Sequence, residues 1–196
     1  MSKKRSNKLT TKITFNSPVT LGFVAICFIA LILNVVTNGT TNNILFSVYR
    51  SSLANPLTYV RFFGHVFGHA SWEHFINNMM YILLLGPLLE EKYGKYDMII
   101  IIAVTAFVTG LINFIFFPHI QLLGASGVVF AFILLSSFAN FQSGKIPVTF
   151  ILVALIYIGQ QIYNGVFASN NISELTHIIG GIVGSAFGFA ENKIKR

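Results

Sequence analysis

The sequence alternates long apolar runs with short polar segments, a pattern typical of a chain that crosses a membrane several times. A transmembrane helix needs about 20 predominantly apolar residues, because the hydrocarbon layer is about 30 Å thick. Candidate runs occupy residues 19–36, 74–89, 98–117, 126–141 and 147–167, and a sixth opens at Thr176. The pattern predicts an all-α, polytopic membrane protein with six transmembrane helices.

Two segments depart from this simple alternation. Residues 38–70 are too polar to cross a bilayer but are rich in Phe and Tyr, which favour the membrane interface, so we expect them to lie in the outer leaflet. Residues 126–141 would cover only about 22 Å of the hydrocarbon layer as a helix. The fourth span is therefore expected to begin below the membrane surface.

The composition supports this interpretation. Of the 196 residues, 54% are hydrophobic and 10% are charged, which excludes an ordinary soluble domain. The single cysteine, Cys27, excludes an intrachain disulfide, and the redox compartment stays undetermined. The net charge of +7 comes from residues that flank the apolar runs, so we expect no nucleic-acid partner.

The basic residues also predict an orientation. Residues 1–17 form a basic tail, residues 18–190 the membrane domain and residues 191–196 a second basic tail. A six-span arrangement with both termini in the cytoplasm places 11 of the 13 basic residues inside and leaves only Arg50 and Arg61 outside. We therefore expect both termini to be cytoplasmic. The spans that begin near residues 74, 126 and 176 would then start at the external side of the membrane.

Ser126 is the candidate nucleophile. It lies between Gly124 and Gly127, which allow another backbone to approach closely, and it opens a helical run. The backbone N–H groups at a helix start have no intrahelical partner and can bind an anion. The alternative is a packing seam of small residues between membrane helices.

His177 is the candidate base. A neutral imidazole can accept the serine proton and return it to a leaving amine. Neither Glu73 nor Glu174 is well placed to orient this ring, so the sequence predicts a Ser–His dyad rather than a triad. The alternative is a histidine that only hydrogen bonds to a backbone carbonyl. Beyond His177, Gly180 and Gly184 continue at four-residue spacing to Gly188, a stripe that lets two membrane helices approach.

His74 and Asn78 are four residues apart, so they share one helix face and can direct two donors at one point. With the Ser126 N–H they would form an oxyanion site. The alternative is a zinc site built from His65, His69 and His74, but neither Asp nor Cys lies nearby. We expect neither a metal nor another cofactor.

Taken in order, these motifs resemble the rhomboid family of intramembrane serine proteases over residues 61–188. The resemblance rests on Arg61-Phe62-Phe63-Gly64-His65, His69, His74-Phe75-Ile76-Asn77-Asn78, Gly124-Ala125-Ser126-Gly127, and His177 with Gly180 and Gly184.

The resemblance implies a six-helix protease that cleaves other membrane proteins within or beside their transmembrane helices. It assigns Ser126 as nucleophile, His177 as base, and His74 and Asn78 as oxyanion donors. It also implies a structural role for Glu90. A bacterial plasma membrane is the expected location, and transmembrane proteins and the lipid bilayer are the expected partners.

Two positions depart from the family pattern. Val60 precedes Arg61 where bacterial relatives often have Trp, which affects how the first loop is anchored. Phe130 stands where a tyrosine commonly packs under the histidine, so the ring can stack but lacks the hydroxyl.

The mechanism also requires water and a route for the substrate. We expect a water-filled cavity lined by His65, Thr109 and Asn113, and by analogy with the family a gate between the second and fifth spans. Two other functions compete with this one. A rhomboid-like pseudoprotease would bind without cutting, although such proteins are expected to lack the serine or histidine. A small transporter would be expected to show an internal repeat, which this sequence lacks.

Overall fold

The computed structural model describes residues 15–137, 146, 148–167 and 174–194. Within these ranges the regular structure is helical, apart from one isolated β-bridge. The long helices are α1 (Pro18–Val36), α4 (Trp72–Tyr93), α5 (Lys95–Phe116), α6 (Ser126–Ser137), α7 (Val148–Phe167) and α8 (Glu174–Ile194). Two short helices, α2 (Thr40–Ile44) and α3 (Pro56–Gly64), and a 3-10 turn, η1 (His65–Phe67), complete the chain. The expectation of an all-α protein is confirmed, and each predicted apolar run overlaps one long helix.

The largest boundary difference is at α4, which extends beyond the predicted residues 74–89 at both ends. It begins earlier because the Ser71 hydroxyl accepts a hydrogen bond from the His74 N–H at 3.2 Å and caps the helix. It ends later because the charged residues Glu90, Glu91 and Lys92, which ended the apolar run, do not interrupt a helix. The helix ends instead at Gly94, which has φ +84. Residues 138–141 of the fourth run, residues 1–14 of the first basic tail and residues 195–196 of the second lie outside the described residues.

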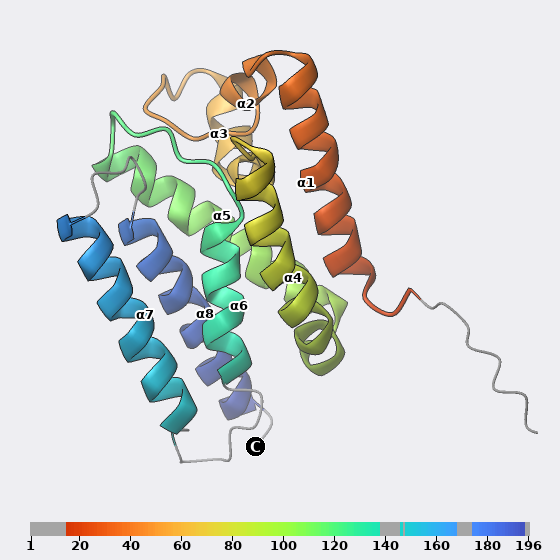
Figure 1. Ribbon diagram of the computed structural model, residues 1–196, viewed down its shortest axis with the longest axis vertical. Helices are drawn as coiled ribbons and strands as arrows, with labels where there is room; N and C mark the ends of the chain where they lie inside the picture. Colours follow the sequence, from red (N-terminus) through yellow and green to blue (C-terminus); the bar gives the residue numbers. More distant parts are fainter. Residues whose placement is uncertain (1–14, 138–145, 147, 168–173, 195–196) are drawn as a thin grey trace, which may run out of the picture.

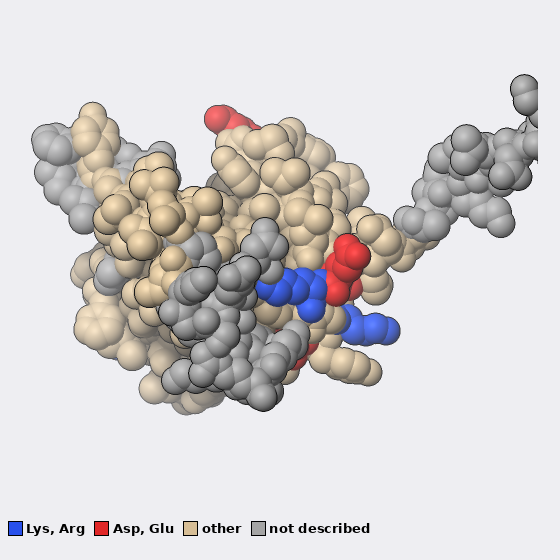
Figure 2. All heavy atoms as spheres, turned by 90° about the horizontal axis from the view of Figure 1, so that it is seen from below, with Lys and Arg blue, Asp and Glu red and all other residues tan. Residues whose placement is uncertain are grey.

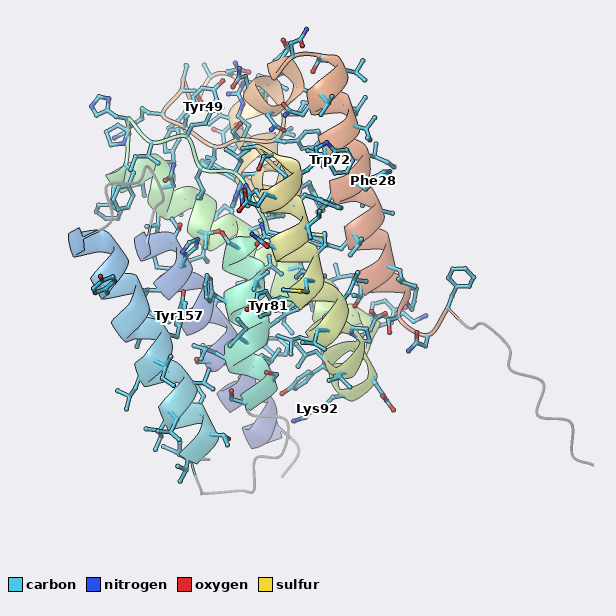
Figure 3. All side chains as sticks on the ribbon, in the orientation of Figure 1. Phe28, Tyr49, Trp72, Tyr81, Lys92 and Tyr157 are labelled. Atoms are coloured by element: carbon cyan, nitrogen blue, oxygen red, sulfur yellow. The ribbon has the colours of Figure 1, made fainter. Side chains whose placement is uncertain are left out.

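The helix surfaces are apolar, as a membrane protein requires. By length and composition, α1 and α5 are the two helices of the described chain that could cross a bilayer, while the apolar parts of α6, α7 and α8 are shorter. Viewed from the end of the bundle that carries Lys92, most of the visible described Lys, Arg, Asp and Glu side chains lie close together, and an acidic side chain lies apart from them at the edge of the molecule (Figures 2 and 3). The number of spans remains a prediction.

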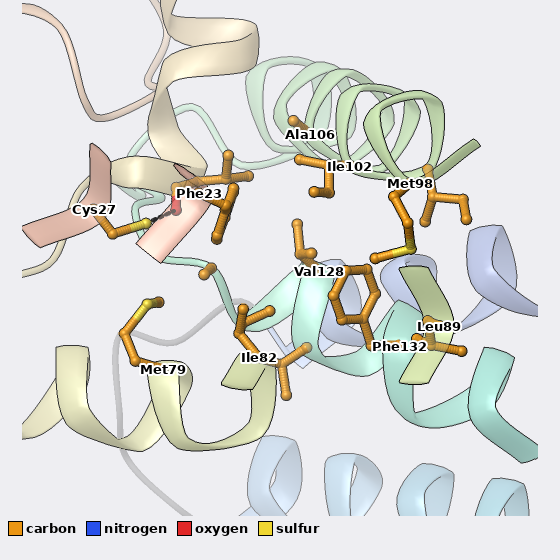
Figure 4. Packing of buried hydrophobic residues seen from close by; sticks show 14 of the residues in the cluster. Phe23, Cys27, Met79, Ile82, Leu89, Met98, Ile102, Ala106, Val128 and Phe132 are labelled. Carbon is orange, nitrogen blue, oxygen red and sulfur yellow. Dashed lines mark hydrogen bonds between the residues drawn. The ribbon is translucent and has the colours of Figure 1, made fainter. Parts of the chain in front are cut away.

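The helices are arranged around α6. This helix lies between α4 and α8, with α5 crossing behind it, while α1 and α7 form opposite edges of the bundle (Figure 1). The α6 side chains Val128 and Phe132 are fully buried against Ile82 of α4 and against Met98 and Ile102 of α5 (Figure 4). The helix that begins with Ser126 therefore forms the centre of the core.

Small residues bring α8 close to α6. A Cβ added at Gly180 would overlap the Gly127 backbone, and one added at Gly184 would overlap the Ala131 backbone. Each helix thus contributes two small residues four positions apart, as small-xxx-small packing requires. The predicted close approach at Gly180 and Gly184 is confirmed, and α6 is the helix that they meet.

Residues 38–70 connect α1 to α4 without forming a long helix. Arg61 is buried in this segment, where its Nε donates to the Ile44 carbonyl at 2.9 Å and its guanidinium lies over the Tyr49 ring at 4.6 Å. Val60 is about half exposed and takes no part in these contacts. The segment is therefore anchored through Arg61, without a contribution from the neighbouring Val60 side chain.

Candidate active site

The start of α6 is held in place by the loop that precedes it. Leu122 and Val48 pair as an antiparallel bridge through hydrogen bonds of 2.9 and 3.0 Å. Two residues later, the Gly124 N–H donates to the His65 carbonyl at 2.9 Å. These contacts tie the loop to residues 38–70, so Ser126 begins its helix on a fixed backbone.

Ser126 and His177 meet across the α6–α8 contact. The His177 Nε2 lies 2.9 Å from the Ser126 Oγ, within hydrogen-bonding distance. Both side chains are partly exposed and both stand in the first turns of their helices. The close approach at Gly180 places the histidine near the serine, because a larger residue there would push α8 away from α6.

Phe130 packs beneath the histidine. It lies one turn along α6 from Ser126, and its ring centroid is 4.9 Å from that of His177. The Phe130 ring also contacts the Tyr157 ring of α7, with 4.1 Å between the ring centroids. The sequence gives no signal for Tyr157, because nothing local relates α7 to the serine.

His74 and Asn78 lie on the α4 face nearest to the serine loop. Gly124 has φ +121, and a Cβ there would lie 2.6 Å from the His74 imidazole and 3.7 Å from the Asn78 Nδ2. Only glycine suits this position, both for its conformation and for the space available. The Asn78 Nδ2 is buried without a hydrogen-bond partner in the described part of the chain, so this donor is available to a ligand.

A cavity of about 500 Å³ brings these groups together. Its lining includes Ser126, His177, His74 and Asn78, which come from three different helices. The rest of the lining comes from the start of α4 and from the loop before α6, namely Ala70, Ser71, Glu73, Asn77, Ile120, Gln121, Leu122 and Leu123. The sequence gives no signal for these loop residues, because apolar positions such as Leu122 and Leu123 resemble core residues.

The predicted cavity lining by His65, Thr109 and Asn113 is wrong. All three side chains are buried away from the cavity and bind backbone carbonyls. The His65 Nε2 lies 3.0 Å from the Ala106 carbonyl, and the Thr109 hydroxyl donates to the Thr105 carbonyl at 2.7 Å. His65 and Asn113 thereby join α5 to the segments beside it, whereas the Thr109 hydroxyl bonds within α5 itself.

The two histidines of the first loop are also buried. Burial lowers the pKa of His65 and of His69 to about 4, and the nearby His74 lowers that of His69 further. The His69 ring contacts the His74 ring edge-on, with centroids 5.1 Å apart, and its Nδ1 lies 3.1 Å from the Phe67 carbonyl. Among the described residues, no group of three His, Cys, Asp or Glu side chains is arranged to hold a metal ion.

Glu90 stands apart from this cavity, near the C-terminal end of α4, where it accepts hydrogen bonds from the start of α1. It is buried and has no part in the chemistry at Ser126. This location is consistent with the structural role that the resemblance implies.

Comparison with known proteins identifies related sequences. The sequence model of the Rhomboid domain matches residues 56–193. The chain is 25% identical over 140 residues to rhomboid protease GlpG of Haemophilus influenzae, covering 69% of this chain and 71% of that protein. It is 32% identical over 138 residues to rhomboid protease GlpG of Salmonella choleraesuis, covering 67% and 48%. Rhomboid-related protein 1 of Caenorhabditis elegans is 29% identical over 141 residues, covering 66% and 39%. The matched part of this chain spans less than half of the last two proteins.

Proposed function

The chain belongs to the rhomboid family, and from this premise we propose that it is a serine-type endopeptidase that cleaves other membrane proteins. The peptide bonds that it would cleave lie within or next to the transmembrane segments of those substrates. One observation carries the proposal, namely the 2.9 Å approach of the His177 Nε2 to the Ser126 Oγ inside a cavity.

In the proposed reaction, His177 removes the Ser126 proton as the Oγ attacks the scissile carbonyl carbon. The tetrahedral intermediate collapses when His177 returns that proton to the leaving amine. Water, activated by the same imidazole, then hydrolyses the acyl-enzyme and restores the serine. Proton transfer in this scheme takes place between Ser126, His177, the leaving amine and water. The proposal requires neither a metal nor another cofactor.

His74 and Asn78 are the proposed oxyanion donors. The Asn78 amide faces the loop beside Gly124 with an unused N–H donor, which supports this assignment. Because the glycine has no side chain, a substrate carbonyl oxygen would approach both donors and the Ser126 backbone N–H without obstruction. Each such donor acts mainly in the transition state, when negative charge develops on that oxygen.

The proposed substrate enters sideways between α4 and α7. A groove of about 240 Å³ separates these helices, with Tyr81 on the α4 side and Val153 and Ile156 on the α7 side. Phe130 and other α6 residues form its floor, directly beside the Ser126 helix turn. A transmembrane substrate would have to unwind here, because a helix hides its carbonyl groups in hydrogen bonds.

We further propose six spans with both termini in the cytoplasm, in a bacterial plasma membrane. The start of α1 and the end of α8 lie at the same end of the bundle, opposite the loops that surround the cavity (Figure 1). This arrangement agrees with the positive-inside pattern and would open the cavity toward the exterior.

The test is incubation of the purified protein with a panel of single-span membrane proteins, with wild type beside Ser126→Ala. A protease cleaves at least one substrate in the wild type and none in the variant. A pseudoprotease would bind a substrate in both forms and cleave it in neither.

A further inference from the structure

Three aromatic rings from three helices form a continuous stack at the catalytic pair. His177 belongs to α8, Phe130 to α6 and Tyr157 to α7, which carries Tyr157 on the side toward the other two (Figure 3). The centroid separations are 4.9 Å from His177 to Phe130 and 4.1 Å from Phe130 to Tyr157. The third ring is 5% exposed, so it is a buried component of the site.

The helix register makes the stack specific. Ser126 and Phe130 are one turn apart on α6, and His177 and Gly181 are one turn apart on α8. A Cβ at Gly181 would lie 3.2 Å from the Tyr157 Cε1, so the tyrosine ring packs against the α8 backbone where no side chain intervenes. One ring of α7 therefore contacts both helices that carry the catalytic pair.

Phe130 needs this support because it has no hydroxyl with which to fix its own orientation. Its ring contacts the His177 ring, and the closer Tyr157 ring covers part of it. Without that cover the phenyl ring would turn toward the groove between α4 and α7, which both aromatic side chains line. The imidazole would then lose the surface against which it packs.

We propose that Tyr157 is a positioning residue that aligns His177 with Ser126 by fixing Phe130. The inference rests on the proposed function and extends it, because it makes the alignment of the base depend on α7. The pair is aligned only while α7 is seated against α6 and α8 at the level of Tyr157.

The test compares Tyr157→Leu, which removes the ring, with Tyr157→Phe, which keeps it. Tyr163→Leu is the matched control, because it makes the same change on the same helix at a side chain that is 63% exposed. Full-length protein in detergent is assayed for substrate cleavage and for melting temperature. We expect Tyr157→Leu to lower kcat by about 10²-fold with little change in KM, as a misplaced catalytic group does. The ring-preserving variant should restore most of this turnover.

A second readout does not depend on activity. In protein with ¹⁵N-labelled histidine, the His177 ring signals are assigned with His177→Gln. They should shift in Tyr157→Leu and stay near their wild-type positions in Tyr157→Phe and Tyr163→Leu. If the His177 signals are unchanged in Tyr157→Leu, the positioning role is wrong, whether or not the wild type cleaves a substrate. A lower melting temperature with unchanged kcat would likewise overturn it. Absence of cleavage by the wild type, with the expected signal shifts, would contradict the proposed function alone.

Discussion

Thr20 donates two hydrogen bonds to the Glu90 carboxylate, one from its backbone N–H and one from its hydroxyl, each 2.9 Å long. The Val19 N–H adds a third at 3.0 Å. Ser17, the N-cap residue of α1, makes no side-chain cap hydrogen bond, so the glutamate from α4 takes that role. An anionic group is also favourable at a helix N-terminus, where the helix dipole is positive. The first helix is therefore fixed to the far end of α4 by one buried side chain.

Replacement of Glu90 by Ala should destabilise the protein. The three lost hydrogen bonds leave the start of α1 without its acceptor, and hydrogen bonds to charged groups contribute about 1.5–3 kcal/mol each to stability in favourable cases. We expect the free energy of unfolding in detergent to fall by at least about 1.5 kcal/mol. Glu91→Ala, at the exposed neighbouring position, should change it by less than about 0.5 kcal/mol. Equal effects of the two substitutions would contradict the capping role.

Gly180→Ala should separate the catalytic pair. The added methyl group would overlap the Gly127 backbone and push α8 from α6, and a displacement of about 1 Å can lower a catalytic rate about 10²-fold. We expect a loss of this size in the rate of substrate cleavage. Ile182→Ala is the control on the same helix, because Ile182 is 60% exposed. Cleavage by Gly180→Ala at the wild-type rate would show that the α6–α8 contact does not set the pair's geometry.

Asn78→Ala should lower kcat much more than KM. An oxyanion donor binds most strongly as negative charge develops, so its loss raises the barrier without weakening substrate binding. We expect a fall of about 10²–10³-fold in kcat, as for one donor in soluble serine proteases. Steady-state kinetics with a single-span substrate measure both constants. A variant that raises KM with normal kcat would instead assign Asn78 to substrate binding.

A strong chelator should leave activity and melting temperature unchanged. The His65 and His69 rings each have a backbone carbonyl partner, at 3.0 and 3.1 Å, and are not arranged as ligands of one ion. If these histidines and His74 hold zinc instead, chelation would abolish activity or lower the melting temperature. Chelator-sensitive activity together with normal turnover by Asn78→Ala would replace the oxyanion assignment with a metal site.

The sequence predicts the parts of this fold that depend on local patterns. Apolar runs locate the long helices, and the four-residue spacing of Gly180 and Gly184 indicates a close helix contact. Spacing along one helix also places His74 and Asn78 together. These features depend only on the spacing of residue types along the sequence, so they can be predicted without knowing which helices are neighbours.

Features that depend on contacts between distant segments could not be predicted in this way. Thr109 and Asn113 are polar residues in an apolar helix, which suggests a cavity, but their partners are backbone carbonyls. Leu122 is a core residue, as its type suggests, but it also lines the cavity, which its type does not indicate. Tyr157 reaches the catalytic pair only because α7 packs beside α6 and α8.

Both termini should be cytoplasmic. The prediction rests on the 11 basic residues that a six-span arrangement places inside, and on the common end of the bundle at which α1 starts and α8 finishes (Figure 1). Tags added before Met1 and after Arg196 should resist protease added to intact cells and be digested after the membrane is opened. Digestion of either tag in intact cells would contradict the orientation and would place the cavity on the other side.

Reaction of Ser126 with a fluorophosphonate probe tests the central proposal most directly, because it reports nucleophile activation without requiring a known substrate. The purified wild type should be labelled, and mass spectrometry should locate the adduct on Ser126. A serine without its base is a poor nucleophile, so His177→Ala should be labelled at least about 10²-fold more slowly, and Ser126→Ala should not be labelled. Labelling of His177→Ala at the wild-type rate, or an adduct on a different residue, would contradict the Ser126–His177 dyad.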